Sequence, residues 1–229
     1  MSSPERPPLT EVVRLLRLHF PIPAIQTDPL KLILWENIGY LIDDYRRQDL
    51  FRAFGEAVGF DPLRIAVADQ ALLYSIARRG GMRPETRVGR WREIARIVLE
   101  DCDGNLDRTL RGLPLGKARA LLKRFPTIGD PGADKILLFC DIATRPCLES
   151  NGLRALARLG VFEEHPTYTA SYKAAIDVLA SAGRPDRDWL VGAHLVLREL
   201  GKKPCKRGTP ICSACPLQEI CPRVEVSGL

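Results

Sequence analysis

Helical periodicity dominates the pattern of apolar and polar positions along the 229-residue chain. Apolar residues recur at spacings of three and four, and proline or glycine interrupts the pattern at intervals. No segment combines strict alternation with turn signals, as a strand would. The pattern predicts an all-α fold of about ten helices. Their expected ranges are 9–20, 29–45, 49–58, 62–78, 87–102, 116–123, 136–143, 153–159, 168–182 and 188–200.

Composition and charge are those of an ordinary globular protein. Hydrophobic residues make up 45% of the chain and charged residues 27%, which suits one large or two small packed units. No apolar run reaches the ~20 residues that span a bilayer, and the first residues lack the plan of a signal peptide. We therefore expect a cytoplasmic protein with no membrane partner. The 34 basic residues against 28 acidic ones are a weak indication of a polyanionic partner.

Four cysteines stand close together near the C-terminus, at Cys205, Cys212, Cys215 and Cys221. Seven cysteines in a cytosolic chain argue against a disulfide framework and for metal binding. Four thiolates in one loop suit either zinc or an iron–sulfur cluster. Zinc ribbons pair two C-x2-C units, whereas the spacing here, C-x6-C-x2-C-x5-C, contains one, and this asymmetry favours iron–sulfur. Cys102, Cys140 and Cys147 fall in or beside helical patterns and are expected to be buried.

The tail that holds these four cysteines is too short to fold by itself. Residues 201–223 contain four cysteines, four prolines and five basic residues. So few residues cannot build a hydrophobic core, so a metal group would have to hold the tail together.

A helix, a tight turn and a second helix are expected over residues 121–133. The second helix would open with Asp130 as its N-cap and Pro131 at its first position, where a missing N–H costs nothing. Gly129 and Gly132 would let a phosphate approach the backbone N–H groups of that helix. Taken alone, the segment also fits an ordinary joint between two helices.

Together, this hairpin and the cysteine tail resemble the helix-hairpin-helix DNA glycosylases, in particular the endonuclease III branch. That family has a hairpin L-P-G-V-G-x-x-x-A, then V-D-x-H or V-D-x-Y, then R-L-G and a four-cysteine loop. The corresponding stretches here are 125–133 (F-P-T-I-G-D-P-G-A), 148–151 (L-E-S-N), 158–160 (R-L-G) and 205–221. The cysteine spacing matches the family loop at every step. Residues 29–44 and 80–82 also fit, so the resemblance covers nearly the whole chain.

The resemblance implies a fold of two lobes with a DNA-binding cleft between them. A six-helix barrel lobe would span residues 28–142 and carry the hairpin. The other lobe would join residues 1–27 to residues 143–229 and carry a 4Fe-4S cluster in the loop 205–221. A damaged base would be flipped out of the duplex, because its glycosidic bond is unreachable inside the stack. The protein would act as a monomer on lesion-containing double-stranded DNA of the nucleoid.

Three departures from the family pattern bear on the chemistry. The position of the family's lysine nucleophile is Pro131, so the usual Schiff base cannot form; Lys135 lies about one helical turn further on. Glu149 stands at the position of the catalytic aspartate, although a carboxylate that starts a helix is the plain alternative. The family's glutamine run, which fills the gap left by the flipped base, reads G-Y-L-I here. Tyr40 or Leu41 would then be an apolar wedge or, equally, a core residue.

The resemblance and the charge pattern together indicate which residues contact DNA. They are Thr127, Ile128, Gly129 and Gly132 in the hairpin, Tyr40 and Leu41 as the wedge, and Lys202, Lys203, Lys206 and Arg207 beside the cysteines. The hairpin would hold a phosphate without reading bases, and the basic residues would add a salt-dependent attraction. The plain alternative for the basic run is a solvated face.

The leading hypothesis is a monofunctional DNA glycosylase of base-excision repair, in which Glu149 activates a water and faces the oxocarbenium-like sugar. Asp44 is the next candidate for the acid. The alternative is a damaged-DNA-binding protein that keeps the fold without glycosylase activity. An iron–sulfur electron carrier fits poorly, because it needs no phosphate-gripping hairpin. The base is not specified, although Trp35, Tyr40 and Tyr45 offer aromatic surface for stacking.

Overall fold

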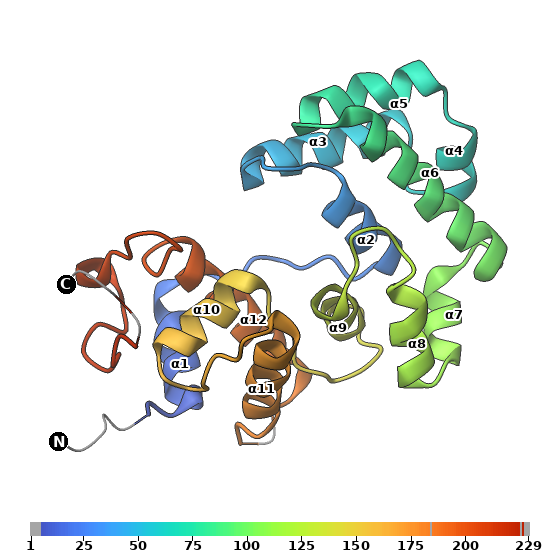
Figure 1. Ribbon diagram of the computed structural model, residues 1–229. Coiled ribbons are helices and arrows are strands. Elements are labelled where there is room, and N and C mark those ends of the chain that lie inside the picture. The colour runs from blue at the N-terminus through green and yellow to red at the C-terminus, as the bar shows by residue number, and fades with distance from the viewer. Residues whose placement is uncertain (1–5, 184, 225, 227–229) are drawn as a thin grey trace. The chain divides into compact units, whose positions relative to one another are not determined.

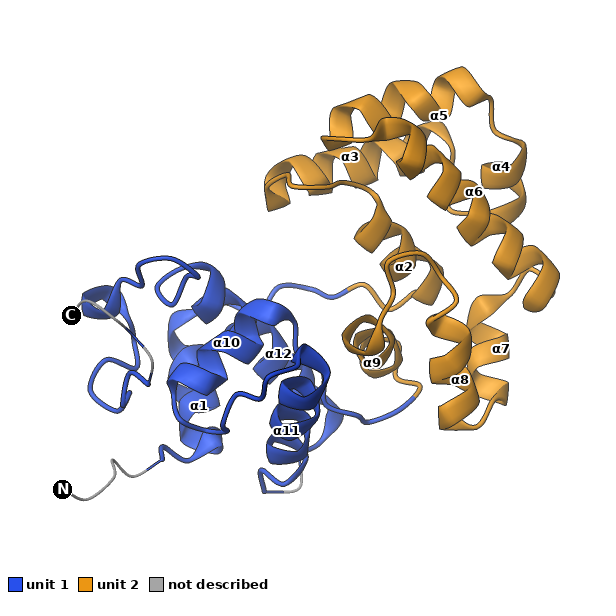
Figure 2. Cartoon of the chain, viewed as in Figure 1, with its two compact units in different colours: residues 1–25, 143–229 blue, residues 26–142 orange. Residues whose placement is uncertain are grey.

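The computed structural model describes residues 6–183, 185–224 and 226. Within these ranges the fold is all-α, as the periodicity predicts. The described residues form no β-strand, and their β-type pairing is an isolated bridge between Tyr40 and Gly81. The chain forms two compact units, shown in Figure 2. We call residues 26–142 the hairpin unit, and residues 1–25 with 143–229 the cysteine unit. None of the described helices is both long and apolar enough to cross a membrane.

The hairpin unit is built around its longest helix, α6. Its α-helices, labelled in Figure 1, are α2 (Pro29–Asn37), α3 (Asp44–Ala57), α4 (Pro62–Val67), α5 (Gln70–Ala77), α6 (Pro84–Asp101), α7 (Leu106–Gly112), α8 (Leu115–Leu122) and α9 (Asp130–Phe139). The 3-10 turn η1 (Arg78–Gly80) follows α5. Trp91 of α6 is fully buried and meets Phe54 edge to face, with ring centroids 4.8 Å apart. Its indole N–H donates to the carbonyl of Asn37 at 3.1 Å. One side chain thereby ties α6 to both α2 and α3.

Five of the eight α-helices in this unit start at a side-chain cap, and three of these caps explain where predicted ranges are wrong. The helix expected over residues 29–45 is two helices, because α2 ends at Asn37 and Asp43 caps a new start for α3. The helix expected over 62–78 likewise breaks where Asp69 caps α5. Asn105 caps α7, which was not predicted. Each of these side chains accepts a bond from the N–H three residues on, which stabilises the new helix end.

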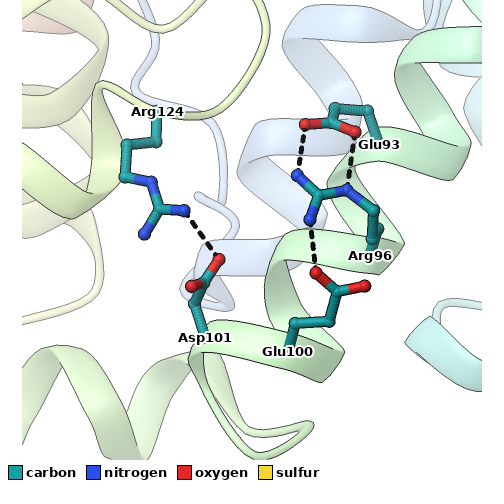
Figure 3. Close-up of polar contacts among 5 residues, drawn as sticks. All are labelled: Glu93, Arg96, Glu100, Asp101 and Arg124. Carbon is teal, nitrogen blue, oxygen red and sulfur yellow. Dashed lines mark hydrogen bonds and ion pairs between the residues drawn. The ribbon is translucent and has the colours of Figure 1, made fainter.

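The C-terminal half of α6 carries arginine–carboxylate contacts, shown in Figure 3. Arg96 donates to the carboxylates of both Glu93 and Glu100, and these bonds raise its pKa. Arg124, which follows α8, donates to Asp101 at 2.9 Å. The end of α6 therefore supports the turn that comes after α8.

The cysteine unit packs its helices around α12. It contains α1 (Leu9–His19), α10 (Ser150–Arg158), α11 (Tyr168–Ala180), α12 (Arg187–Lys202) and the 3-10 turn η2 (Cys212–Ala214). The core joins α1, α10 and α12 through buried side chains such as Leu16, Leu156 and Leu197. Gly201 allows the end of α12 to rest on the first turn of α10. A Cβ at this position would lie 2.2 Å from the carbonyl oxygen of Asn151.

Candidate functional site

The turn between α8 and α9 is held from its inner side. Phe125 and Ile128 are buried, and the side-chain Nδ2 of Asn37 donates to the carbonyl of Pro126 at 2.9 Å. Thr127 is exposed and adopts a φ of +65°, a left-handed conformation that costs a non-glycine residue about 1–2 kcal/mol. The family hairpin has glycine here. Strained residues of this kind persist where the surroundings over-determine them, commonly at functional sites.

The N-terminus of α9 is open. Gly129 is its N-cap and brings no side-chain cap, so the predicted cap at Asp130 is wrong. Asp130 lies inside the helix, and its carboxylate contacts Lys123 at 3.0 Å and Arg119 at 3.1 Å. Gly129 is exposed, and an added Cβ would meet only the Cδ of Pro131, at 3.8 Å. Because the first N–H groups of a helix lack intrahelical partners, this end can donate to an anion.

The predicted hairpin residues have different surroundings. Thr127 is exposed, whereas Ile128 is buried and its N–H donates to the carbonyl of Phe125 at 3.2 Å. Gly132 lets the first turn of α9 lie over Ile128, since a Cβ there would be 3.3 Å from the Cγ2 of that residue. Below the turn, Arg119 donates to the fully buried Asp134 at 2.7 Å. Ile128 and Gly132 therefore support the shape of the turn.

No lysine of α9 is available as an unpaired nucleophile. Pro131 has no nucleophilic side chain, and Lys135 forms an ion pair with Glu36 of α2. The ammonium also lies 6.0 Å from the ring centroid of Phe139. A nucleophilic lysine needs a free amine, whereas this one is held in the ion pair with Glu36.

Two short loops of the hairpin unit are paired. The N–H of Tyr40 donates to the carbonyl of Gly80 at 2.9 Å, and Tyr40 forms the parallel bridge with Gly81. Gly81 has a φ of +88°, and a Cβ would lie 2.3 Å from the carbonyl oxygen of Tyr40, so no other residue fits there. Tyr40, Leu41 and Met82 are 52%, 77% and 59% exposed. The core-packing alternative is thus wrong for Tyr40 and Leu41.

Met82 is a candidate that the sequence analysis missed. The two bridged segments run in the same direction. Met82, which follows Gly81, therefore lies on the same side of the bridge as Leu41, which follows Tyr40. Leu41 and Arg83 have φ values of +54° and +58°, a left-handed conformation that is strained for both residues. We call Tyr40, Leu41 and Met82 the apolar tip. The sequence does carry a signal for Met82. It is a large apolar residue that directly follows a Gly-Gly pair and lies outside the helical patterns on either side.

The aromatic candidates for base stacking are differently placed. Trp35 packs edge to face on Phe51, with ring centroids 5.4 Å apart, and Arg47 lies 5.8 Å from its ring centroid. Tyr45 is 81% exposed. Trp35 therefore has aromatic and cationic neighbours within its own unit, whereas the ring of Tyr45 is open.

Glu149 caps α10 in the cysteine unit. Its Oε1 accepts from the N–H of Gly152 at 2.9 Å, and its Oε2 accepts from the Nδ2 of Asn151 at 2.7 Å. This is the helix-start role that the sequence offered as the alternative. Each carboxylate oxygen has a second lone pair, so the cap leaves two acceptor positions. Burial raises the pKa of Tyr168, and the charge of Glu149 raises it further, because the two side chains are close.

Hydrogen bonds connect Glu149, through α10, to the segment of residues 203–224, which we call the cysteine loop. Asn151 donates to Glu149 and accepts from Arg154 at 3.0 Å. Arg154 also donates to the carbonyl of Cys205 at 3.4 Å. One turn later, Arg158 donates to the same carbonyl at 3.3 Å and to the Sγ of Cys205 at 3.5 Å. A single helix therefore positions both the candidate carboxylate and a candidate metal ligand.

The four C-terminal cysteines line one pocket, whose walls also include Arg158 and Pro210. None of these four forms a disulfide, and Cys102, Cys140 and Cys147 are buried, as predicted. In the described part of the chain, no three His, Cys, Asp or Glu side chains are placed to hold one metal ion. The four cysteines thus share a pocket, but the described side chains are not arranged as a metal site.

The pocket disfavours bare thiolates. Burial raises the pKa of Cys215 and Cys221, and the other cysteines of the loop raise it further. A bound metal reverses this preference, because a coordinated thiol is deprotonated. Cys205, Cys215 and Cys221 also pack against the core of the cysteine unit. Four soft donors in one pocket are the chemistry that iron–sulfur clusters use.

The predicted basic residues beside the cysteines, Lys202, Lys203, Lys206 and Arg207, are all exposed. Lys203 forms an ion pair with Glu199 at 3.0 Å, and its Nζ lies 5.5 Å from the ring centroid of Phe20. Surface lysines and arginines of this kind can neutralise phosphates in a salt-dependent way.

Comparisons with known proteins bear on the whole chain. No family model matches the sequence. A curated relative, endonuclease III of Sulfolobus acidocaldarius, is 27% identical over 172 residues, which are 75% of this chain and 71% of the relative. The sequence similarity therefore covers most of both proteins.

Solved structures are similar over nearly the full length. A trapped covalent endonuclease III–DNA intermediate, the estranged-adenine complex, has a TM-score of 0.73 and 14% identity and covers 94% of this chain and 96% of its own. A non-covalent endonuclease III–DNA complex has a TM-score of 0.73 and 16% identity and covers 94% of each chain. A thermostable thymine-DNA glycosylase has a TM-score of 0.71 and 14% identity and covers 94% of this chain and 95% of its own. The chain has the fold of endonuclease III and is similar to it in sequence, which confirms the resemblance to the endonuclease III-like branch of the helix-hairpin-helix DNA glycosylases.

Proposed function

We propose that this protein is a DNA glycosylase of base-excision repair, which hydrolyses the N-glycosidic bond of a damaged or mismatched base flipped out of duplex DNA. The similarity to endonuclease III, in sequence and in fold, carries the proposal. Two of the similar structures are complexes with DNA, and a third is a thymine-DNA glycosylase. The protein would act as a monomer on lesion-containing DNA of the cytoplasmic nucleoid.

The hairpin unit would make two kinds of DNA contact. The N–H groups behind Gly129 would hold a backbone phosphate, which positions the protein without reading bases. Leu41, with Tyr40 and Met82 beside it, would enter the base stack where the damaged nucleotide leaves, since apolar wedges stabilise an unstacked step. The exposed basic residues beside the cysteines would add salt-dependent attraction.

Glu149 would carry the hydrolysis. A water oxygen bonds to the sugar C1′ as the bond to the base breaks; the carboxylate takes one water proton, and a proton from solvent compensates the departing base. The same carboxylate faces the positive charge that develops on the sugar. Gly152 and Asn151 fix its orientation. Glutamate is one methylene longer than the aspartate of the family, a displacement of roughly 1 Å that the backbone has to compensate for full activity.

We propose no lyase step. One similar structure is a trapped covalent intermediate of endonuclease III with DNA, and such a bond needs a side-chain nucleophile. In this chain Pro131 stands at the corresponding position and Lys135 is paired with Glu36. Borohydride should therefore not trap the protein on damaged DNA. A trapped complex that disappears in Lys135→Ala would contradict the monofunctional proposal.

The cysteine loop would hold a 4Fe-4S cluster through Cys205, Cys212, Cys215 and Cys221. The shared pocket, the four soft donors and the family resemblance support this assignment. When bound, the cluster would supply four cross-links within the loop and stabilise the thiolates. We assign it no part in the hydrolysis itself.

Glu149→Gln tests the proposed chemistry, with release of bases from single-lesion duplexes as the measurement. We expect base release to be abolished and DNA affinity to stay within a few-fold. Asp186→Asn is the matched control, because Asp186 caps α12 of the same unit and accepts from the N–H of Trp189 at 2.7 Å. That variant should keep its activity. Full activity in Glu149→Gln would place the acid elsewhere, with Asp44 as the next candidate.

A damaged-DNA-binding protein without activity is the second candidate, and one observation favours it. Both carboxylate oxygens of Glu149 are already engaged by the cap of α10, which accounts for the residue without any chemistry. The variant Glu149→Asp separates the two functions. We expect it not to raise activity; if it switches on base release in an otherwise inert protein, the native chain is a binder.

A further inference from the structure

We propose that a groove along α10 binds a phosphate ester together with an unstacked base, as a short single-stranded stretch of DNA presents them. The groove has a volume of about 980 Å³ and lies wholly in the cysteine unit. One face of α10 forms a wall, and the segment before α11 and the end of the cysteine loop form the others. The lining residues that matter here are Asn151, Arg154, Arg158, Tyr168 and Arg207.

Positive charge outweighs negative charge in this groove. Four arginines and two glutamates line it, and Arg6 contacts Glu163 at 3.7 Å. Three guanidiniums are left with one lining carboxylate. Arg154, Arg158 and Arg207 all line this one groove, so their guanidiniums repel one another. An anion between these guanidiniums would relieve the repulsion and accept charge-assisted hydrogen bonds.

The cysteine loop uses only part of this charge. The Nη2 of Arg154 donates hydrogen bonds to the carbonyls of Gly201 and Cys205. Its Nε is buried and has no hydrogen-bond partner among the described residues. Arg158 lines both the groove and the cysteine pocket. Arg207 lines the groove without lining the cysteine pocket, and its side chain is exposed. Arg207 is therefore the residue best placed to meet an incoming phosphate.

An aromatic surface makes the groove suited to more than an inorganic anion. Tyr168 stacks on Tyr172, with ring centroids 6.3 Å apart and 16° between the planes. Tyr168 is 49% exposed, so part of its surface is open to a ligand. A base could extend the stack there, which is how proteins combine basic grooves and aromatic rings to hold single strands.

The groove begins beside the candidate catalytic carboxylate. Ser150 and Asn151, the two residues after Glu149, line it. A nucleotide reacting at Glu149 would have its neighbours on the strand close to this groove. The choice of DNA as the source of the phosphate rests on the proposed function. The recognition chemistry does not, because a free nucleotide carries the same phosphate and base.

The test is binding of an undamaged, fluorescent oligothymidylate of about five nucleotides to the full-length protein, measured by anisotropy. We expect Arg207→Glu to weaken binding about tenfold and Tyr168→Ala about fivefold, while Tyr168→Phe keeps the ring and the affinity. The control is Lys173→Glu, an equal change of charge at an exposed position of α11 outside the groove. It should weaken binding by less than about twofold.

Equal losses in Arg207→Glu and Lys173→Glu would overturn the proposal, because long-range attraction alone would then explain the binding. Equal losses in Tyr168→Phe and Tyr168→Ala would overturn the stacking. Competition separates the sources: displacement by thymidine monophosphate that depends on Arg207 indicates a free nucleotide, and displacement only by oligonucleotide indicates a strand. Because the probe is undamaged and no bond breaks, this result is independent of whether the protein shows glycosylase activity.

Discussion

The hairpin turn of residues 123–129 buries two large apolar side chains of its own, Phe125 and Ile128, whereas the longer cysteine loop of residues 203–224 buries Pro204 and Leu217. The turn is also tied to the hairpin unit by Arg124 and Asn37. The cysteine loop is instead bonded by arginines of α10, and the proposed cluster would cross-link its thiols. Burial of its own side chains orders the first segment, and cross-links would order the second. Substitutions should therefore affect the two segments differently.

Removal of a thiol should have the largest effect. Cys212→Ser should lose iron and solubility, because the cysteine loop has too small a core to remain folded without its cross-links. Iron analysis and the broad absorbance near ~400 nm measure the loss. Cys102→Ser, a buried cysteine outside the loop, should keep its iron. Stoichiometric zinc and no iron in anaerobically purified protein would overturn the cluster assignment.

Removal of a buried ring should be next in size. Phe125→Ala should lower the free energy of unfolding of the hairpin unit by about 3–5 kcal/mol, through lost burial and the cavity left behind. Denaturant unfolding measures it, with Leu115→Ala as the control, since that side chain is 44% exposed. The iron content should not change. Iron loss in Phe125→Ala would show that the two regions depend on each other.

One arginine anchors each of the two segments, so the same substitution can be compared in both. Arg158→Gln should loosen the cysteine loop by about 2 kcal/mol, because this half-buried guanidinium donates to loop carbonyls and to a thiol. Arg124→Gln should cost less than about 1 kcal/mol, since its ion pair with Asp101 is exposed. Hydrogen exchange of each segment and the rate of iron release to a chelator are the measurements. Equal effects would contradict the difference in anchoring.

The smallest effect on stability should come from the open end of α9. Gly129→Val should cost less than about 1 kcal/mol, because the glycine has a negative φ and space around it. It should nevertheless weaken binding to undamaged duplexes of every sequence by about tenfold, since the side chain blocks a phosphate. Gly89→Val, at an open position of α6, is the control. Affinity that depends on sequence, or that stays flat with salt, would contradict a phosphate contact.

The helices could be predicted largely from periodicity, and the misses have a common cause. Apolar spacing continues through the breaks near Asp43 and Asp69, so the pattern alone does not show where one helix stops. The caps at these residues are short local signals that compete with it. At Asp130 the opposite error occurs, because a good capping residue was available but its carboxylate pairs with Arg119 and Lys123.

The sequence by itself determined the all-α class, the burial of Cys102, Cys140 and Cys147, and the four-thiol character of the tail. These properties depend on residues close together in the chain, whose spacing is directly visible. The tertiary structure decided that Met82 shares a tip with Leu41, that Lys135 pairs with Glu36, and that α10 connects Glu149 to Cys205. Such contacts join residues far apart in the chain, and their geometry depends on how whole helices pack, which no local pattern records.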